Sequence, residues 1–336
     1  MMAVERKQIL QKLYTTVYCQ CFSPCGKYLA ACDNFGRVAL FNLSNALAAD
    51  ATDSSWKPCH IFQAHDGPIY SLASSKDFLI SAGTGDIKGW NWSDVINKIP
   101  KIVWALSIPN TGNFDNPETN SIALDNKNGP SHLFAGCGDN NIHMWDLESG
   151  HLMKSFEGHT DYVHSVILRN NCRECISGSE DGTVRVWDVR SPHEAVHMIE
   201  PYKQEECSRP QMGKWIGCVA TDPGDDWLVC GGGPQLSIWF LRSLTFTTVF
   251  ETPQTCQQHA MFYDDEIISA GTSGVVHHWN VNGESRSHVP CSPGSVFNVN
   301  INTNSDSNKV LSVAGNCSKI DVCTNFGYTA FSLDFC

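Results

Sequence analysis

Short apolar runs of strand length alternate with turn residues along the whole chain. Two stretches, 135–150 (AGCGDNNIHMWDLESG) and 177–190 (SGSEDGTVRVWDVR), follow one template. Each reads small residues, an Asp in a tight turn, an alternating apolar run and then Trp-Asp. Alternation of apolar and polar positions is typical of a half-buried β-strand. The pattern therefore predicts β-strands joined by tight turns.

The template recurs seven times, which predicts a repeat architecture. Its copies lie 40 to 55 residues apart, near the roughly 40–45 residues of one four-stranded blade of a WD40 β-propeller. One blade cannot bury both of its faces alone, so successive blades must stack around a ring. We predict an all-β fold, a seven-bladed WD40 propeller that forms a single domain over residues 15–336. The Trp position of the seven copies falls at Phe41, Trp90, Trp145, Trp187, Trp239, Trp279 and Cys323.

Residues 1–14 are expected to form a separate, helical N-terminal segment. In ERKQILQKLY (5–14), the apolar side chains of Ile9, Leu10 and Leu13 share one side of the predicted helix, with charges opposite. This stripe either packs on the propeller or serves as a docking handle for a partner. We expect the last strand of the chain to complete its own blade, so that closure is made by the C-terminus.

The fourth copy resembles the WD-repeat family residue by residue. Gly158-His159, Asp181 and Trp187-Asp188 match the family's Gly-His, turn Asp and Trp-Asp. In that family a His, a Ser or Thr, an Asp and a Trp form a buried hydrogen-bonded tetrad. The resemblance assigns these roles to His159, Ser177, Asp181 and Trp187, with Ser179 as the alternative hydroxyl.

We interpret this His-Ser-Asp set as structural and not as a catalytic triad. A buried His needs hydrogen-bond partners, and an Asp that accepts its N–H fixes the tautomer. A tetrad of this kind buries its Ser, and the chain has no G-x-S-x-G motif. Partial tetrads are predicted in the second copy (His65, Ser81, Trp90), the sixth (His259, Ser269, Trp279, with Gly274 near the Asp position) and the third (Asp139, Trp145, with Ala135 in the Ser position).

Charge and cysteine usage narrow the function further. The chain has 23 Lys and Arg against 35 Asp and Glu, a net charge of −12, which repels a phosphate backbone. Most of its 16 cysteines lie in strand-like runs, as expected in a reducing compartment. Cys172 and Cys175 form a lone C-x-x-C, whereas structural zinc needs four ligands. We expect no catalytic residue, metal, cofactor, membrane span or small-molecule substrate.

Two segments are candidates for contacts with other proteins. The loop 201–214 is the longest irregular link, and exposed Tyr and Arg are favoured interface anchors. The alternative is that this loop packs only against its own blades. The pattern W-D-x-R at 187–190 resembles the box through which propeller receptors dock onto cullin-RING ubiquitin ligases. The candidate residues are Tyr202, Lys203, Glu205, Glu206 and Arg209 in the loop, and Trp187, Asp188 and Arg190 in the box.

Several irregular segments are similar to the family of the sixth subunit of the THO complex. They include 62–71 (FQAHDGPIYS), 205–222 (EECSRPQMGKWIGCVATD) and 324–333 (TNFGYTAFSL). The resemblance implies a non-enzymatic scaffold in the nucleus that couples transcription and mRNA processing to mRNA export. It also implies docking onto other THO subunits, chiefly the coiled-coil fifth and seventh, and contact with mRNA only indirectly through the complex. The rival interpretation is a ligase substrate receptor.

Overall fold

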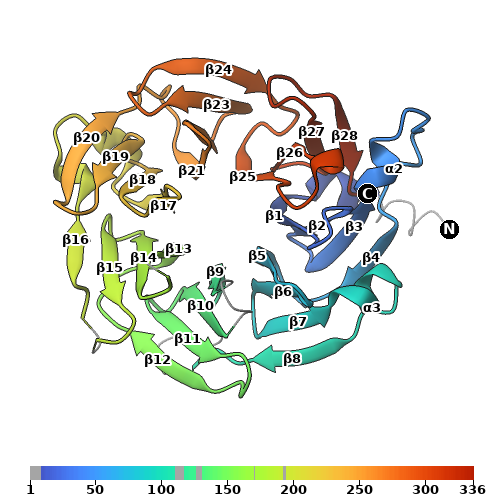
Figure 1. The fold of residues 1–336 in the computed structure, drawn as a ribbon, viewed down its shortest axis with the longest axis horizontal. Coiled ribbons are helices and arrows are strands. Elements are labelled where there is room, and N and C mark those ends of the chain that lie inside the picture. Colours follow the sequence, from blue (N-terminus) through green and yellow to red (C-terminus); the bar gives the residue numbers. More distant parts are fainter. Residues whose placement is uncertain (1–8, 110–116, 126–130, 170, 192–193) are drawn as a thin grey trace. The chain divides into compact units, whose positions relative to one another are not determined.

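The computed structural model describes residues 9–109, 117–125, 131–169, 171–191 and 194–336. The fold is a seven-bladed β-propeller, in which each blade is a sheet of four strands taken in sequence order (Figure 1). The prediction of the fold class is therefore confirmed. The residues group into two compact units, one formed by the segments up to 105, 273–275 and 289–336, the other by 106–272 and 276–288.

The first unit holds blades one, two and seven. Blade one consists of β1 (Val17–Phe22), β2 (Tyr28–Asp33), β3 (Arg37–Asn42) and β4 (His60–Gln63), with the short helix α2 (Leu43–Ala46) after β3. Blade two consists of β5 (Ile69–Ser74), β6 (Phe78–Gly83), β7 (Ile87–Asn91) and β8 (Ile102–Leu106), with α3 (Trp92–Ile96) after β7. Blade seven consists of β25 (Val296–Ile301), β26 (Leu311–Gly315), β27 (Lys319–Cys323) and β28 (Phe331–Asp334), with the 3-10 turn η3 (Asp306–Asn308) before β26.

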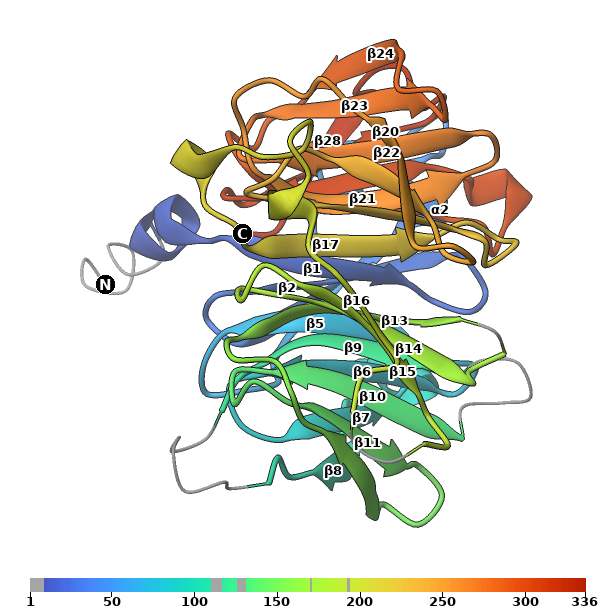
Figure 2. The same cartoon turned by 90° about the vertical axis from the view of Figure 1, so that its left-hand side faces the viewer.

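The second unit holds most of blades three to six. Blade three consists of β9 (Thr119–Leu124), β10 (His132–Cys137), β11 (Ile142–Asp146) and β12 (Leu152–Phe156), and blade four of β13 (Val163–Arg169), β14 (Glu174–Ser179), β15 (Val184–Asp188) and β16 (His197–Ile199). Blade five consists of β17 (Ile216–Thr221), β18 (Trp227–Gly232), β19 (Ser237–Phe240) and β20 (Thr245–Val249), and blade six of β21 (Gln257–Tyr263), β22 (Glu266–Gly271), β23 (Val275–Asn280) and β24 (Ser285–Pro290). Two 3-10 turns, η1 (Pro201–Lys203) and η2 (Pro210–Met212), lie in the loop between β16 and β17 (Figure 2).

The second strand of each blade is buried almost throughout, and within the second unit the neighbouring blades three and five pack against blade four on both sides. In β14, five consecutive residues are buried, so this strand lacks the alternation of a one-sided sheet. Glycines in these strands allow the side chains of the next blade to approach closely. A Cβ on Gly136 would lie 2.7 Å from Val163 of the next blade, and one on Gly178 would lie 2.6 Å from Ile216. The apolar clusters accordingly draw their residues from pairs of successive blades.

Blades seven and one, both in the first unit, are joined by side-chain amides. The strand β28 pairs with β27 and completes its own blade, as the sequence predicted. Three asparagines of blade seven donate from Nδ2 to backbone carbonyls of blade one. Asn300 bonds to Gln20 O at 3.2 Å, Asn302 to Gly26 O at 2.8 Å and Asn304 to Ser23 O at 3.0 Å. This junction therefore needs no exchanged strand among the described residues.

An apolar cluster also spans this junction. Phe22, Leu29 and Phe41 of blade one share it with Ile320 and Leu333 of blade seven, and all five side chains are buried. At the outer edge, the rings of Trp56 and Phe331 stack with their centroids 5.6 Å apart. Directional amide bonds and apolar burial thus act together where the first and last blades meet.

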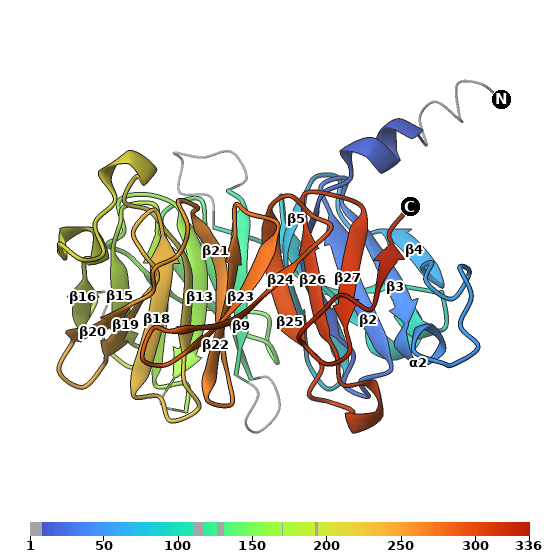
Figure 3. The same cartoon turned by 90° about the horizontal axis from the view of Figure 1, so that it is seen from above.

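The N-terminal helix is described over residues 9–14, and the rest of the predicted helix, 5–8, lies outside the described residues. The side chains of Ile9, Leu10 and Leu13 are 60%, 44% and 70% exposed. The alternative in which this stripe packs on the blades is therefore wrong. Figure 3 shows the helix extending away from blade one. The division into a helical segment 1–14 and one domain 15–336 stays a prediction.

All sixteen cysteines are free thiols, and nine of them are buried. Burial raises the pKa of Cys19 to about 11, so this thiol stays protonated and inert at neutral pH. None of the helices in the described part of the chain has the length and apolar character needed to cross a membrane.

We predict that Asn302→Ala weakens the junction of blades seven and one. Asn302 is fully buried and donates at 2.8 Å both to Gly26 O and to Asn308 O. The substitution leaves two buried carbonyls without these donors, which should lower the free energy of unfolding by ~1–3 kcal/mol. Urea unfolding followed by tryptophan fluorescence measures the change. Asn97→Ala, at an exposed position, is the control. An equal effect in both variants would contradict a stabilising role of Asn302 at the junction of blades seven and one.

Buried networks and candidate interaction site

Blade four contains a continuous hydrogen-bond network with the four predicted side chains. Trp187 Nε1 donates to Ser177 Oγ at 2.9 Å, and Ser177 Oγ lies 2.7 Å from His159 Nε2. His159 Nδ1 lies 2.8 Å from Asp181 Oδ2. The indole can only donate and the ionised carboxylate can only accept. Each group therefore donates its hydrogen to the next, from Trp187 to Ser177, from Ser177 to His159 and from His159 to Asp181. The other candidate hydroxyl, Ser179 Oγ, donates instead to Asp161 O.

The electrostatics of this network fit a neutral His beside a charged Asp. Burial lowers the pKa of His159, although Asp181 acts in the opposite direction. Burial alone would raise the pKa of Asp181, but hydrogen bonds from His159 and Thr183 outweigh it and hold that pKa below the usual value. Asp181 also accepts the backbone N–H of Thr183 at 2.8 Å and of Thr160 at 3.1 Å, which ties the turn to the preceding loop.

The His-Ser-Asp distances match those of a hydrolytic triad, but the surroundings do not. Ser177 is fully buried in the middle of β14. Its Oγ already accepts from Trp187, and no part of it reaches solvent. A substrate carbonyl therefore has no path to this hydroxyl.

Blade two builds a similar network without a carboxylate. His65 Nε2 lies 2.8 Å from Ser81 Oγ, which accepts from Trp90 Nε1 at 2.9 Å. A backbone hydrogen bond to Thr84 in the tight turn takes the place of the Asp, and burial lowers the pKa of His65 to about 4. The three side chains predicted for this blade are thus brought together.

In blade six the predicted role of His259 is wrong. Trp279 Nε1 donates to Ser269 Oγ at 3.0 Å, but His259 pairs through its backbone with Ala270 inside the sheet. Its Nδ1 is buried without a hydrogen-bond partner. The physical reason is position. The network His of blade four precedes its first strand by four residues, whereas His259 is the third residue of β21.

Blade three supplies a His that sequence reasoning missed. The turn carboxylate Asp139 Oδ2 lies 2.9 Å from His143 Nε2, and His143 Nδ1 lies 2.8 Å from Ser155 Oγ. His143 comes from β11 of the same blade, two residues before Trp145. The sequence carried a signal for this, namely a polar side chain four residues after the turn Asp. Arg185 occupies the equivalent position in blade four, four residues after Asp181.

The same region offers the best arrangement of metal-ligating atoms in the described residues. Atoms of Cys137, Asp139 and His143 lie within 4.8 Å of one another. Burial raises the pKa of Cys137 well above its usual value, which disfavours the thiolate that a metal requires. Both ring nitrogens of His143 already have partners, and zinc needs a fourth ligand. We interpret the set as a structural network.

The expectation that Arg209 is an exposed interface anchor is wrong. Its side chain is 6% exposed and donates to four backbone carbonyls. Nε bonds to Gly233 O at 2.9 Å, and the two terminal nitrogens bond to Gly232 O at 3.3 Å, Pro234 O at 3.1 Å and Pro253 O at 3.3 Å. Most of the guanidinium's hydrogen bonds are thus made to the tight turn of blade five, whose glycine-rich sequence lacks the Asp found in the turns of blades one, three and four.

The rest of the loop 201–214 lies at the surface. Glu205 and Glu206 are exposed, and Lys203 is exposed and pairs with Glu200 at 2.7 Å. Tyr202 is half-buried, and its hydroxyl donates to Glu200 at 3.0 Å. The loop therefore packs on its own blades through Arg209 and exposes side chains of 203, 205 and 206 to solvent, and the contact of this outward part with another protein stays a prediction.

The W-D-x-R box is only partly accessible. Trp187 is buried in the network of blade four, whereas Arg190 is exposed and forms a two-pronged ion pair with Asp188. Its Nε and terminal nitrogen lie 3.1 and 2.9 Å from the two carboxylate oxygens. A docking partner could reach the Asp188–Arg190 pair but not the indole.

Comparison with known proteins adds a family to this geometry. The WD domain, G-beta repeat family matches residues 7–38, 56–91 and 150–188. The THO complex subunit 6 homolog of Mus musculus is 47% identical over 330 residues, 98% of this chain and 95% of that protein. THO complex subunit 6 of Drosophila melanogaster is 35% identical over 96% of this chain and 90% of that protein. The Arabidopsis thaliana protein of the same name is 30% identical over 81% of this chain and 75% of its own length.

We predict that Asp181→Ala destabilises the fold. The substitution leaves His159 buried without its acceptor and frees the N–H groups of Thr160 and Thr183. Loss of such partners lowers the free energy of unfolding by ~1–3 kcal/mol, measurable by urea unfolding at pH 7. Asp53→Ala, at an exposed position, should be neutral. An unchanged stability in the Asp181 variant would argue against the network.

The lowered pKa values of His159 and His65 also predict acid sensitivity. Their unfolded-state pKa is about 6.5, while the folded state holds both rings neutral at lower pH. The unfolded chain therefore binds more protons, and stability falls as the pH drops below about 6.5. For His65 this loss continues to about pH 4. Melting temperatures measured between pH 7.5 and pH 5 test this loss of stability. In the double variant Ser81→Ala with His65→Phe, the melting temperature should fall less steeply with falling pH. If the melting temperature of that variant fell with pH as steeply as that of the unchanged protein, His65 would not be a source of the acid sensitivity.

Proposed function

The chain belongs to the family of THO complex subunit 6, and on this premise we propose that it is a non-enzymatic scaffold subunit of a THO complex in the nucleus. There it would couple transcription and mRNA processing to mRNA export through contacts with other proteins. The observation that carries the proposal is 47% identity over 98% of the chain. The similarity covers nearly the whole chain, well beyond the three segments that the repeat family matches.

The sealed networks support a role without catalysis. The triad-like group of blade four has no access for a substrate, because Ser177 is fully buried and hydrogen-bonded. The Asp139–His143 pair of blade three is likewise buried. Polar groups that could do chemistry are therefore engaged in holding the fold.

The helix 9–14 is the surface that best suits a helical partner. Ile9, Leu10, Leu13 and Tyr14 are all exposed by 44% or more within six residues. An apolar helix face of this kind is buried when it packs against another helix, and coiled coils offer matching seams. We therefore propose that this face contacts coiled-coil subunits of the THO complex, the fifth and seventh.

The helix is fixed to the propeller at its C-terminal end, which favours a specific interface. Lys12 Nζ lies 2.5 Å from Asp334 Oδ2 of the last strand. Thr15 Oγ1 donates to Gln11 O at 2.6 Å, and Thr16 N donates to Asn34 Oδ1 at 2.9 Å. A helix held in this way loses less conformational freedom on binding than a free segment.

The outward part of the loop 201–214 is a second proposed contact. Its exposed side chains are Lys203, Glu205 and Glu206, and Tyr202 is half-exposed beside them. Arg209 would act only indirectly, because its guanidinium holds the loop against the turn of blade five. Substitutions at 202–206 test the contact without disturbing that anchor.

We predict that Leu10→Asp with Leu13→Asp lowers co-purification with the coiled-coil THO subunits by about tenfold or more, the effect of losing interface anchors. Both positions are exposed, so the melting temperature should not change. Val103→Asp with Met153→Asp, at positions 51% and 57% exposed on outer strands, is the matched control.

A second pair of variants separates the two proposed contacts. If binding survives the helix change but fails with Tyr202→Ala and Glu205→Lys, the interface lies on the loop and the helix proposal is wrong. If both variants bind normally and Arg190→Glu abolishes capture of a ligase adaptor, the alternative function as a ubiquitin-ligase substrate receptor replaces the THO proposal.

We also predict that the isolated chain binds RNA weakly. With a net charge of −12, it would repel the phosphate backbone, and contact with mRNA would come only indirectly through the complex. Fluorescence anisotropy with a short unstructured RNA should show weak binding that disappears as salt is raised. Tight binding that is insensitive to salt would contradict indirect contact.

A further inference from the structure

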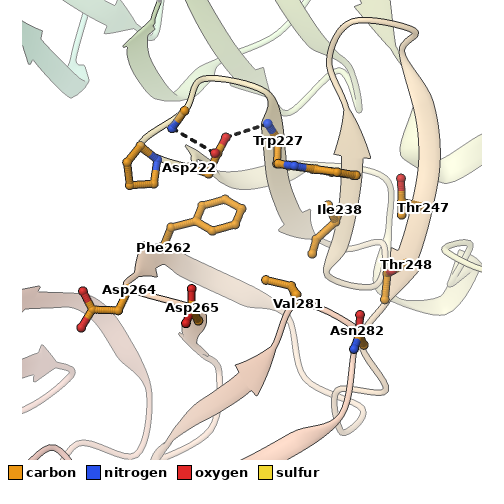
Figure 4. A pocket seen from close by; sticks show the side chains of 12 residues that line it. Asp222, Trp227, Ile238, Thr247, Thr248, Phe262, Asp264, Asp265, Val281 and Asn282 are labelled. Atoms are coloured by element: carbon orange, nitrogen blue, oxygen red, sulfur yellow. Dashed lines mark hydrogen bonds between the residues drawn. The ribbon is translucent and has the colours of Figure 1, made fainter.

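A cavity of about 480 Å³ opens between blades five and six, within the second unit (Figure 4). This volume lies in the range of binding sites for small ligands. The middle of the cavity is apolar, with Trp227, Ile238, Phe262 and Val281 around it. Trp227 is 36% and Val281 47% exposed, so water contacts apolar surface that a ligand could cover.

One end of the cavity is acidic. Asp264 and Asp265 lie there on the tight turn between β21 and β22, with Asp222 across from them (Figure 4). Asp222 accepts three backbone N–H groups, including that of Trp227 at 2.7 Å, so it fixes the Trp227 backbone. Asp264 and Asp265 are exposed and take part in no ion pair among the described residues.

No basic side chain lines the cavity. Two arginines on the same two blades are already paired, Arg242 with Asp226 at 2.8 Å and Arg286 with Glu266 at 2.7 Å. The cavity therefore combines an aromatic and aliphatic wall with uncompensated negative charge at one end. The other end carries the hydroxyls of Thr247 and Thr248 and the amide of Asn282.

We propose that this cavity binds an arginine side chain presented by an extended segment of a protein partner. An arginine has an aliphatic stem that covers apolar surface and a planar cation at its tip. That cation stacks on the face of a Trp and pairs with carboxylates in two-pronged geometry. The hydroxyls and amide at the other end would accept or donate hydrogen bonds to the backbone of the segment.

The charges select this occupant over others. An RNA phosphate would face three carboxylates, which disfavours it, and a purely apolar side chain would leave the acidic end unused. A lysine carries the charge but neither stacks nor pairs in two-pronged fashion as a guanidinium does. The inference rests on the cavity alone and holds whether or not the chain joins a THO complex.

The test uses the full chain and a fluorescein-labelled peptide with two Gly-Arg-Gly repeats. Its matched partners carry citrulline, which has the shape of arginine without its charge, or lysine. Fluorescence anisotropy should show the arginine peptide binding about tenfold more tightly than the citrulline peptide, with the lysine peptide between them. Equal affinity for the arginine and citrulline peptides would overturn the proposal.

Variants locate the binding. Asp264→Asn with Asp265→Asn, and separately Trp227→Ala, should each weaken the arginine peptide by about tenfold. Asp66→Asn with Asp77→Asn removes the same charge from exposed positions elsewhere and should leave affinity intact. If this control weakens binding as much, only bulk charge is involved and the proposal fails. Should Trp227→Ala lower the melting temperature, Val281→Arg at an exposed turn must abolish binding by filling the cavity, and unchanged binding in that variant contradicts the site.

Discussion

In blades one, four and five, side chains satisfy the backbone groups of the tight turn between the second and third strands, because a buried backbone group without a partner costs free energy. In blade one, Asp33 accepts the N–H groups of Phe35 and Arg37 at 3.0 and 2.8 Å. In blade four, Asp181 accepts the N–H of Thr183. Blade five has a Gly-Gly-Pro turn and reverses the chemistry, because Arg209 donates to its carbonyls instead. Different side chains thus meet one requirement, and the sheets keep a common geometry.

This requirement explains why the chain resembles an enzyme locally, while the contacts that we propose with partners lie elsewhere. A His, a Ser and an Asp at hydrogen-bond distance are what a buried turn needs, and burial lowers the pKa of His159 as it would near an active site. A structural network differs from an active site in that a substrate cannot reach it. The surfaces that we propose for binding are instead open to solvent, namely the apolar helix 9–14 and the acidic cavity beside Trp227. Both are suited to protein partners.

Sequence reasoning found the seven copies because one template recurs along the chain, and it found the network of blade four because that copy resembles the WD-repeat family residue by residue. It failed where a residue acts from outside the repeat. Arg209 lies in an irregular loop among other charged residues, and nothing in its sequence context shows that four carbonyls converge on it. His259 does not join a network because it lies inside β21, whereas His159 lies four residues before β13. The asparagines joining blades seven and one were missed, since their partners lie at the other end of the chain.

Hydrogen–deuterium exchange of the isolated chain, read by mass spectrometry, tests most directly whether the buried turns hold the fold. We expect peptides that cover the turns at 33–37 and 181–183 to exchange only when the whole protein unfolds, at rates that follow the global stability. Peptides that cover the helix 9–14 should exchange rapidly in the free chain and become protected when coiled-coil THO subunits are added. Turns that exchange as fast as the exposed loop 202–206 would show that these networks do not hold the blades.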